Sequence, residues 1–225
     1  MVDIPWPTDI FPYKVMFYLQ PHVGGSESPL TRVRKVYGLS APRWVARLSF
    51  RSGVDGAPRF SDQNGFGPRL DALIADLEGG LNLAVFHDFR RPRPLQPIAV
   101  QRTLVSTGAA RGATSMVVEG FTPYSIAMSV SDYVHGGDGR PHMVSAAATI
   151  AAGGSINGAG TILADASGSA RIGFKPPLAQ AMAAGTPLAW PVTGRFQLVS
   201  EDAGQNESEV GADVEHALDF VEDLR

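Results

Sequence analysis

GPRLDALIADLEGGLNLAVFHD, residues 67–88, places a helix and a strand in direct succession. Pro68 suits the first turn of a helix, where its missing N–H costs nothing. The apolar residues after it recur at the i, i+3, i+4, i+7 spacing of one helix face: Leu70, Leu73, Ile74 and Leu77. Gly79 and Gly80 supply a C-terminal stop, and the apolar run 81–88 then predicts a strand. A helix with a single apolar stripe needs a sheet to cover, so this stretch predicts a helix packed on a β-sheet.

Other segments predict the strands of that sheet. RWVARLSFRS, residues 43–52, alternates between an arginine face and an apolar face made of Trp44, Ala46, Leu48 and Phe50. Shorter or less regular apolar segments predict further strands at 15–21, 31–39, 192–200 and 215–225. GGSESP, residues 24–29, is typical of a Gly/Ser loop. The 25 glycines and 17 prolines favour many short strands joined by turns over a helical bundle.

The middle of the chain, residues 101–183, has smaller residues, fewer charges and repeated glycine turns. Four segments within it predict short strands: 114–120, 124–134, 142–152 and 169–178. Larger residues return at Trp190. We therefore predict one discontinuous domain, 1–100 and 184–225, interrupted by an inserted accessory β-domain at 101–183. The fold class is mainly β with one α-helix.

The first dozen residues are rich in proline and aromatic side chains. Proline is excluded from helix and sheet interiors, so this stretch predicts an extended arm. Trp6, Phe11 and Tyr13 give the arm apolar surface but too little length to bury it. We expect the arm to lie on a neighbouring copy or on an adjoining ring.

Charge is distributed unevenly along the chain. Residues 1–102 carry 13 Lys/Arg against 9 Asp/Glu, and residues 103–225 carry 6 against 13. The last stretch, 201–225, has nine acidic residues and one basic residue. Either the two parts are solvated faces, or surfaces of opposite sign meet between copies. In the second case the acidic stretch would face arginines of a neighbour such as Arg32, Arg34 or Arg47.

No residue constellation predicts a reaction or a metal site. The five histidines lack helical i, i+4 spacing and an HExxH context, and cysteine is absent: His22, His87, His135, His142 and His216. His87 and Asp88 are adjacent in a predicted strand, so they point to opposite faces and favour a structural role over a catalytic dyad. HGGDGRPH, residues 135–142, favours a hairpin turn over an active loop.

The glycine-rich and acidic stretches do not match a phosphate-binding or calcium-binding motif either. GGSINGAG, residues 153–160, lacks the Lys-Ser/Thr ending of a phosphate-binding loop, and no GxSxG or GxGxxG motif occurs. Glu201 and Asp202 lack the D-x-D-x-D-G context of a calcium loop. We predict no catalytic, cofactor or metal site, and no enzyme. A dense basic stripe interleaved with aromatics is also missing, so nucleic-acid specificity is not expected.

Two stretches resemble a known family. They are RWVARLSF to RLDALIADLEGGLNLAVFHDFRRPRP, within residues 43–94, and GTPLAWPVTGRFQLVSEDAG followed by VEHALDFVEDLR, within 185–225. Together they are similar to the distal tail protein of long, flexible-tailed phages and of related gene transfer agents and prophages. SVSDYVHGGDGRPHMV, residues 129–144, resembles the accessory domain of such proteins, as does the GFKPPL ending at 173–178.

The resemblance implies a belt domain, a split β-barrel or sandwich closed against one helix, with a small inserted β-barrel or sandwich. Six belts would pair edge to edge in a homohexameric ring at the virion tail tip, assembled in the host bacterial cytoplasm. The implied partners are the tail tube protein, a hub or baseplate protein and, as a further candidate, the tape measure protein. No membrane span is expected, because no run of about 18 apolar residues occurs.

One alternative belongs to a different class, a carbohydrate-binding β-sandwich that contacts the host cell surface. Sugar platforms need exposed aromatic faces. Residues 101–183 contain no tryptophan and only four other aromatics: Phe121, Tyr124, Tyr133 and Phe174.

Overall fold

The computed structural model describes residues 1–52, 67–95, 104–137, 139–200, 203 and 214–224. The fold is mainly β, as predicted. It consists of two compact units, one formed by Met1–Phe89 with Arg195–Arg225 and one by Arg90–Gly194.

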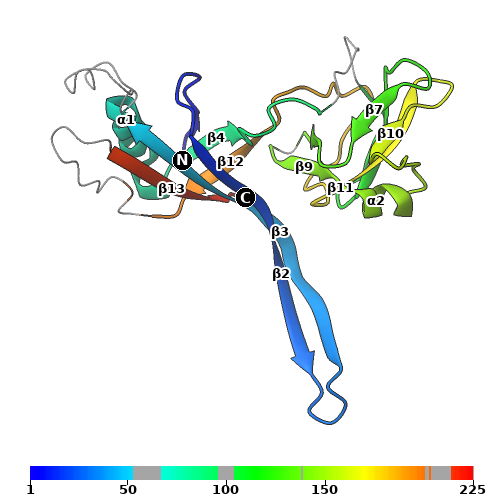
Figure 1. The fold of residues 1–225 in the computed structure, drawn as a ribbon, viewed down its shortest axis with the longest axis horizontal. Coiled ribbons are helices and arrows are strands. Elements are labelled where there is room, and N and C mark those ends of the chain that lie inside the picture. Colours follow the sequence, from blue (N-terminus) through cyan, green and yellow to red (C-terminus); the bar gives the residue numbers. More distant parts are fainter. Residues whose placement is uncertain (53–66, 96–103, 138, 201–202, 204–213, 225) are drawn as a thin grey trace. The chain divides into compact units, whose positions relative to one another are not determined.

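The first unit contains a six-stranded sheet (Figure 1). Its strands, in spatial order, are β1 (Asp3–Pro5), β4 (Leu83–His87), β12 (Thr193–Leu198), β13 (Val214–Glu222), β3 (Arg34–Ser52) and β2 (Lys14–Glu27). β1 lies parallel to β4, whereas β12–β13, β13–β3 and β3–β2 are antiparallel pairs. Strands from both ends of the chain therefore build one sheet.

The predicted alternation of residues 43–52 is confirmed. Trp44, Ala46, Leu48 and Phe50 are at most 1% exposed, and the arginines between them face solvent. Aromatic rings from several strands join this face, and Phe86 stacks on Phe196 with ring centroids 4.2 Å apart. The core of the first unit is therefore an aromatic cluster on one face of the sheet.

The predicted helix is α1 (Gly67–Leu77), followed by the one-turn 3₁₀ helix η2 (Glu78–Gly80). Leu70, Leu73 and Leu77 are buried, which confirms the apolar stripe. Gly80 has φ +94°, and a Cβ built there would lie 2.5 Å from the carbonyl oxygen of Leu198. Glycine is therefore required both to end the helix and to bring the chain close against β12.

The prediction of an N-terminal arm is wrong for Trp6, whereas Phe11 and Tyr13 are exposed as expected. Residues 3–5 form β1, and Trp6 is only 9% exposed. Four aromatic rings surround its indole: Phe50, Phe86, Phe89 and Phe220. The indole nitrogen donates to the Ile10 carbonyl at 2.8 Å, so the ring is buried without an unsatisfied polar atom. The short segment buries its indole in its own chain because β1 pairs with β4 and Trp6 N donates to the Val85 carbonyl.

The expected Gly/Ser loop at 24–29 is also wrong in part. β2 continues to Glu27 and β3 begins at Arg34, so the two strands form a hairpin far longer than the segments 15–21 and 31–39 predicted. The strands continue through their glycine and proline residues. This is possible because β2 is an edge strand, where proline is tolerated, and because its register shifts twice at irregular positions.

The second unit holds two sheets around one apolar core. The five-stranded sheet has the order β5 (Leu104–Thr107), β6 (Ser115–Glu119), β11 (Ser169–Lys175), β9 (Pro141–Val144), β8 (Tyr133–His135). The smaller sheet pairs β7 (Ile126–Ser129) with β10 (Thr161–Leu163). Met128 and Ile162 of the small sheet share the core with Ile172 and Phe174 of the large one.

A second helix corrects two predictions, the strand at 142–152 and the count of one α-helix. β9 ends at Val144, and α2 (Ala146–Ala151) follows. The Ser145 side chain accepts a hydrogen bond from Ala148 N and so caps the helix. A run of alanines favours helix over strand once such a cap is present. α2 packs closely on β11, since a Cβ at Gly173 would lie 2.1 Å from the carbonyl carbon of Ala148.

The inserted unit is wider than the predicted 101–183 and extends over Arg90–Gly194. On the entering side, Leu95 N donates to the Asp132 carboxylate at 2.8 Å. On the leaving side, the indole of Trp190 donates to a carbonyl of β8 at 2.9 Å. The unit therefore begins before residue 101, where the composition of the sequence changes.

Replacing Trp6 by alanine tests whether the N-terminal segment belongs to the core. We expect Trp6→Ala to lower the free energy of unfolding by about 3–5 kcal/mol, the usual cost of removing a buried tryptophan. Phe11→Ala is the matched control, because Phe11 is 63% exposed. It should change stability by less than about 0.5 kcal/mol in the same urea titration. Equal, small effects of both substitutions would contradict the burial of Trp6.

Candidate interaction surface

The hairpin of β2 and β3 extends beyond the sheet as a two-stranded ribbon (Figure 1). β2 and β3 pair from Lys14 and Ser49 to Glu27 and Arg34, but β13 pairs only with residues 45–52 of β3. Residues 20–43, here named the outer hairpin, therefore have a strand neighbour on one side only. Every side chain from 31 to 40 is exposed.

The outer hairpin exposes several large apolar side chains to solvent. Six large apolar side chains are between 52% and 94% exposed: Val23, Leu30, Val33, Val36, Tyr37 and Leu39. A two-stranded hairpin is at best marginally stable alone in water, and exposed apolar clusters mark interaction sites. The ribbon is therefore suited to pack against a partner.

One close contact explains how the ribbon tolerates its glycines. Gly24 pairs with Tyr37, whose ring covers it. A Cβ at Gly24 would lie 2.7 Å from a carbon of that ring. The glycine that resembles a loop residue in the sequence thus makes room for a cross-strand aromatic ring.

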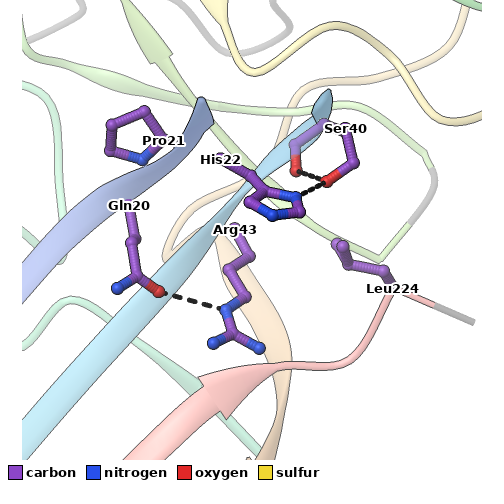
Figure 2. Close-up of a pocket in the computed structure, with 7 residues that line it drawn as sticks. Gln20, Pro21, His22, Ser40, Arg43 and Leu224 are labelled. Carbon is purple, nitrogen blue, oxygen red and sulfur yellow. Dashed lines mark hydrogen bonds between the residues drawn. The ribbon is translucent and has the colours of Figure 1, made fainter. Parts of the chain in front are cut away.

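A pocket lies at the base of the outer hairpin (Figure 2). The cavity of about 360 Å³ is lined by Gln20, Pro21, His22, Ser40, Ala41, Arg43 and Leu224. Arg43 Nε donates to Gln20 Oε1 at 3.2 Å, and His22 Nδ1 shares a hydrogen bond of 2.7 Å with Ser40 Oγ. These bonds hold the strands together at the point where their register shifts.

The outer hairpin is also basic. It carries Arg32, Arg34, Lys35 and Arg43 against the single acid Glu27. Among the described residues, none of the three cations at positions 32, 34 and 35 forms an ion pair. These side chains are free to meet an acidic partner.

Arg47, closer to the sheet, does not have this freedom. Its guanidinium makes two hydrogen bonds to the Asp219 carboxylate, at 2.6 and 2.7 Å. The expectation that Arg47 faces acids of a neighbouring copy is therefore wrong, because β13 of the same chain supplies the acid.

The inner part of β2 offers a second surface. β2 is the last strand of its sheet, and within the described residues no strand pairs with its outer edge. Met16 and Tyr18 on this strand are 45% and 41% exposed, and Phe11 and Tyr13 just before it are exposed as well. Open edges promote pairing with another chain.

The histidines considered as catalytic candidates are scattered. His87 is half-buried against Phe89, with ring centroids 4.9 Å apart, and burial lowers its pKa while the charge of Asp88 opposes that shift. His142 is fully buried, and its Nδ1 donates to the Pro176 carbonyl at 2.7 Å. No group of three potential metal ligands occurs in the described part of the chain.

Segment 135–142 forms the predicted hairpin, because His135 pairs with Pro141 across β8 and β9. Asp138, at its tip, lies outside the described residues. Glu201 and Asp202, considered for calcium, also lie outside them.

One aromatic of the second unit is presented to solvent, which the sequence did not indicate. Phe121, Tyr133 and Phe174 are buried, but Tyr124 is 72% exposed. Tyr124 has φ +61° in a turn closed by a hydrogen bond from Ser125 N to the Thr122 carbonyl. A non-glycine residue rarely occupies that region, so the turn holds the ring outward at a cost in backbone strain.

No model of a known protein family matches the chain, and no curated protein sequence matches it significantly. No helix among the described residues has the length and apolar character needed to cross a membrane.

Acidification tests whether the buried histidines serve the fold. Burial lowers the pKa of His216 and of His87 below the ordinary 6.5, with Asp71 and Asp88 opposing the shifts. Below pH 6.5 the unfolded chain therefore binds protons that the folded chain does not, and stability falls as pH falls toward the folded pKa values. We expect His216→Gln to lose less unfolding free energy than the wild type between pH 7.5 and 5.5. Identical losses in urea titrations at the two pH values would refute this role.

Proposed function

We propose that the chain is a structural subunit of a closed ring at the distal end of a phage or phage-like tail, joining the tail tube to a hub or baseplate. The outer hairpin is the observation that carries this proposal. It is a ribbon supported by one sheet edge, with six exposed apolar side chains and three cations that form no ion pair with the part of the chain that the structure describes. Such a ribbon gains stability by packing on another subunit.

The open edge of the sheet supports assembly through many copies. β2 lies at one end of the strand order, and within the described residues no strand bonds to the backbone groups of its outer edge. The three-residue β1 lies at the other end. Contacts between unlike surfaces of identical subunits close into rings when the rotation between subunits allows it. A homohexamer is the number that the family resemblance implies.

The arrangement of units agrees with the resemblance described above. A sheet with one packed helix is interrupted by a second β-rich unit, which is the plan expected of a belt domain with an accessory domain. Further copies, the tube protein, the hub protein and the tape measure protein are the proposed partners. The tail tip is the proposed location, and the role needs no catalytic residue, cofactor or metal.

A hairpin deletion tests the ring. Gln20 pairs directly with Arg43, so residues 21–42 can be replaced by Asn-Gly, which suits a two-residue turn. We expect the full chain to form rings, alone or with candidate tube and hub proteins, in analytical ultracentrifugation and negative-stain images. The shortened chain should keep a cooperative unfolding transition in urea and lose ring formation. A full-length chain that stays monomeric alone and with both partners would refute the proposal.

The carbohydrate-binding alternative gains support from Tyr124. Its exposed ring lies just before β7, in a segment tied to β10 by a hydrogen bond of 2.9 Å from Ala164 N to the Ser125 carbonyl. Ile126 and Leu163, paired across β7 and β10, are also exposed. An exposed aromatic ring is suited to stack on the apolar face of a sugar.

Tyr124→Gly tests this alternative without damaging the fold, because glycine adopts φ +61° more readily than tyrosine. If the second unit binds a saccharide, the variant should lose binding to host-cell polysaccharide in a pull-down while its unfolding free energy stays equal or rises. Tyr124→Phe keeps the ring and should retain binding. Equal binding by all three proteins, or none by the wild type, would exclude Tyr124 as a sugar platform.

A further inference from the structure

The tip of the outer hairpin combines exposed apolar side chains with cations. Leu30 and Val33 are 94% and 56% exposed, and the exposed cations Arg32, Arg34 and Lys35 follow or flank them in the sequence. Among the described residues, none of these three cations forms an ion pair. A surface of this kind is complemented by one that combines apolar side chains with carboxylates.

The solvent-facing side of α1 has that complementary character. Successive residues of a helix are rotated by about 100°, so Ala72 and Ala75 lie opposite the buried leucine stripe, and both are exposed. The same rotation puts Asp71 on one side of these alanines and Asp76 on the other. The helix therefore presents a shallow apolar strip with a carboxylate on each side.

The apolar and acidic character continues past the end of α1. Glu78 of η2 is exposed, and Leu81 just after it is 66% exposed. The only cation in the α1 sequence, Arg69, is bound by Asp9, and the three carboxylates form no ion pair with the described residues. These exposed residues are here named the outer helix face: Asp71, Ala72, Ala75, Asp76, Glu78 and Leu81.

The hairpin tip and the outer helix face of one chain lie at opposite ends of the first unit (Figure 1). Burial lowers the pKa of His216 and the charge of Asp71 opposes this shift, so Asp71 lies near His216, which pairs with Phe50 of β3. Arg34 is sixteen positions from Phe50 along β3. At about 3.3 Å per residue, the two surfaces are roughly 50 Å apart, so a chain cannot neutralise its own hairpin in this way.

We propose that the tip of the outer hairpin binds the outer helix face of a second copy. The apolar side chains of the tip pack on the alanines and Leu81, and its cations face the carboxylates. The contact rests on the proposed function and specifies how neighbouring subunits recognise each other. It joins two unlike surfaces, so each copy uses its hairpin on one neighbour and its helix on another, as ring closure requires. Exposed ion pairs are screened by salt, so association weakens as ionic strength rises.

Charge reversal at both surfaces gives a sharp test. One variant carries R32E, R34E and K35E, and the other carries D71K, D76K and E78K. All six positions are exposed, so urea titrations should show that both variants fold. In each variant the hairpin and the helix face bear the same sign, so self-association should fall at least about ten-fold.

An equimolar mixture of the two variants tests whether the two surfaces meet each other. Every hairpin then finds a helix face of opposite sign on an alternating partner, so association should recover. Sedimentation at low and high salt, under conditions in which the wild type forms rings, measures both the loss and the recovery. Three exposed cations of the second unit provide the matched control, since R111E, R171E and K175E make the same change of charge and should leave association unchanged.

The outcomes separate this contact from the ring itself. Rings from the wild type, with either variant associating equally well or with no recovery in the mixture, would overturn the contact and leave the ring proposal standing. A wild type that stays monomeric alone and with tube and hub proteins would overturn both. Hairpin-dependent binding to anionic vesicles, with self-association unchanged in both variants, would also overturn the contact and assign the hairpin to a lipid surface.

Discussion

The shared use of β3 is the constraint on which the first unit depends. Residues 44–50 of this strand present four alternating side chains to the core and pair with β13 on one side and β2 on the other. The same strand continues without a break into the outer hairpin. Packing of its inner half thus holds its outer half in register, so the core of the unit stabilises a ribbon that would not persist alone.

The aromatic cluster beside β3 includes residues from near both ends of the chain. Trp6 lies against Phe50 of β3, Phe86 of β4 and Phe220 of β13. Phe86 stacks in turn on Phe196 of β12. The chain leaves this unit after Phe89 and returns at Arg195, so the inserted unit interrupts a core that is completed only by the returning strands. Burial of these rings is what holds segments that are distant in the sequence in one sheet.

The described surface has features that are suited to association with a partner. Its histidines are separated and serve different local contacts, such as the bond of His142 to Pro176. Within the described residues, the features that stand out are the open edge of β2 and an exposed ribbon that carries Arg32, Arg34 and Lys35. These features support the proposed association, since a partner can cover the apolar side chains and neutralise the cations.

The sequence by itself determined the elements whose patterns are local. The stripe of Leu70, Leu73 and Leu77 and the alternation of residues 43–52 carry their own periodicity, so helix and strand followed from them. Only tertiary structure decided where Trp6 lies, which depends on rings from distant strands, and how far β2 and β3 extend, which depends on their pairing with each other. Gly24 is a strand residue because Tyr37 covers it, and Arg47 is unavailable to a neighbour because Asp219 binds it. Cross-strand contacts that place a glycine under an aromatic ring leave no periodic trace in a sequence, and the outer hairpin depends on such a contact.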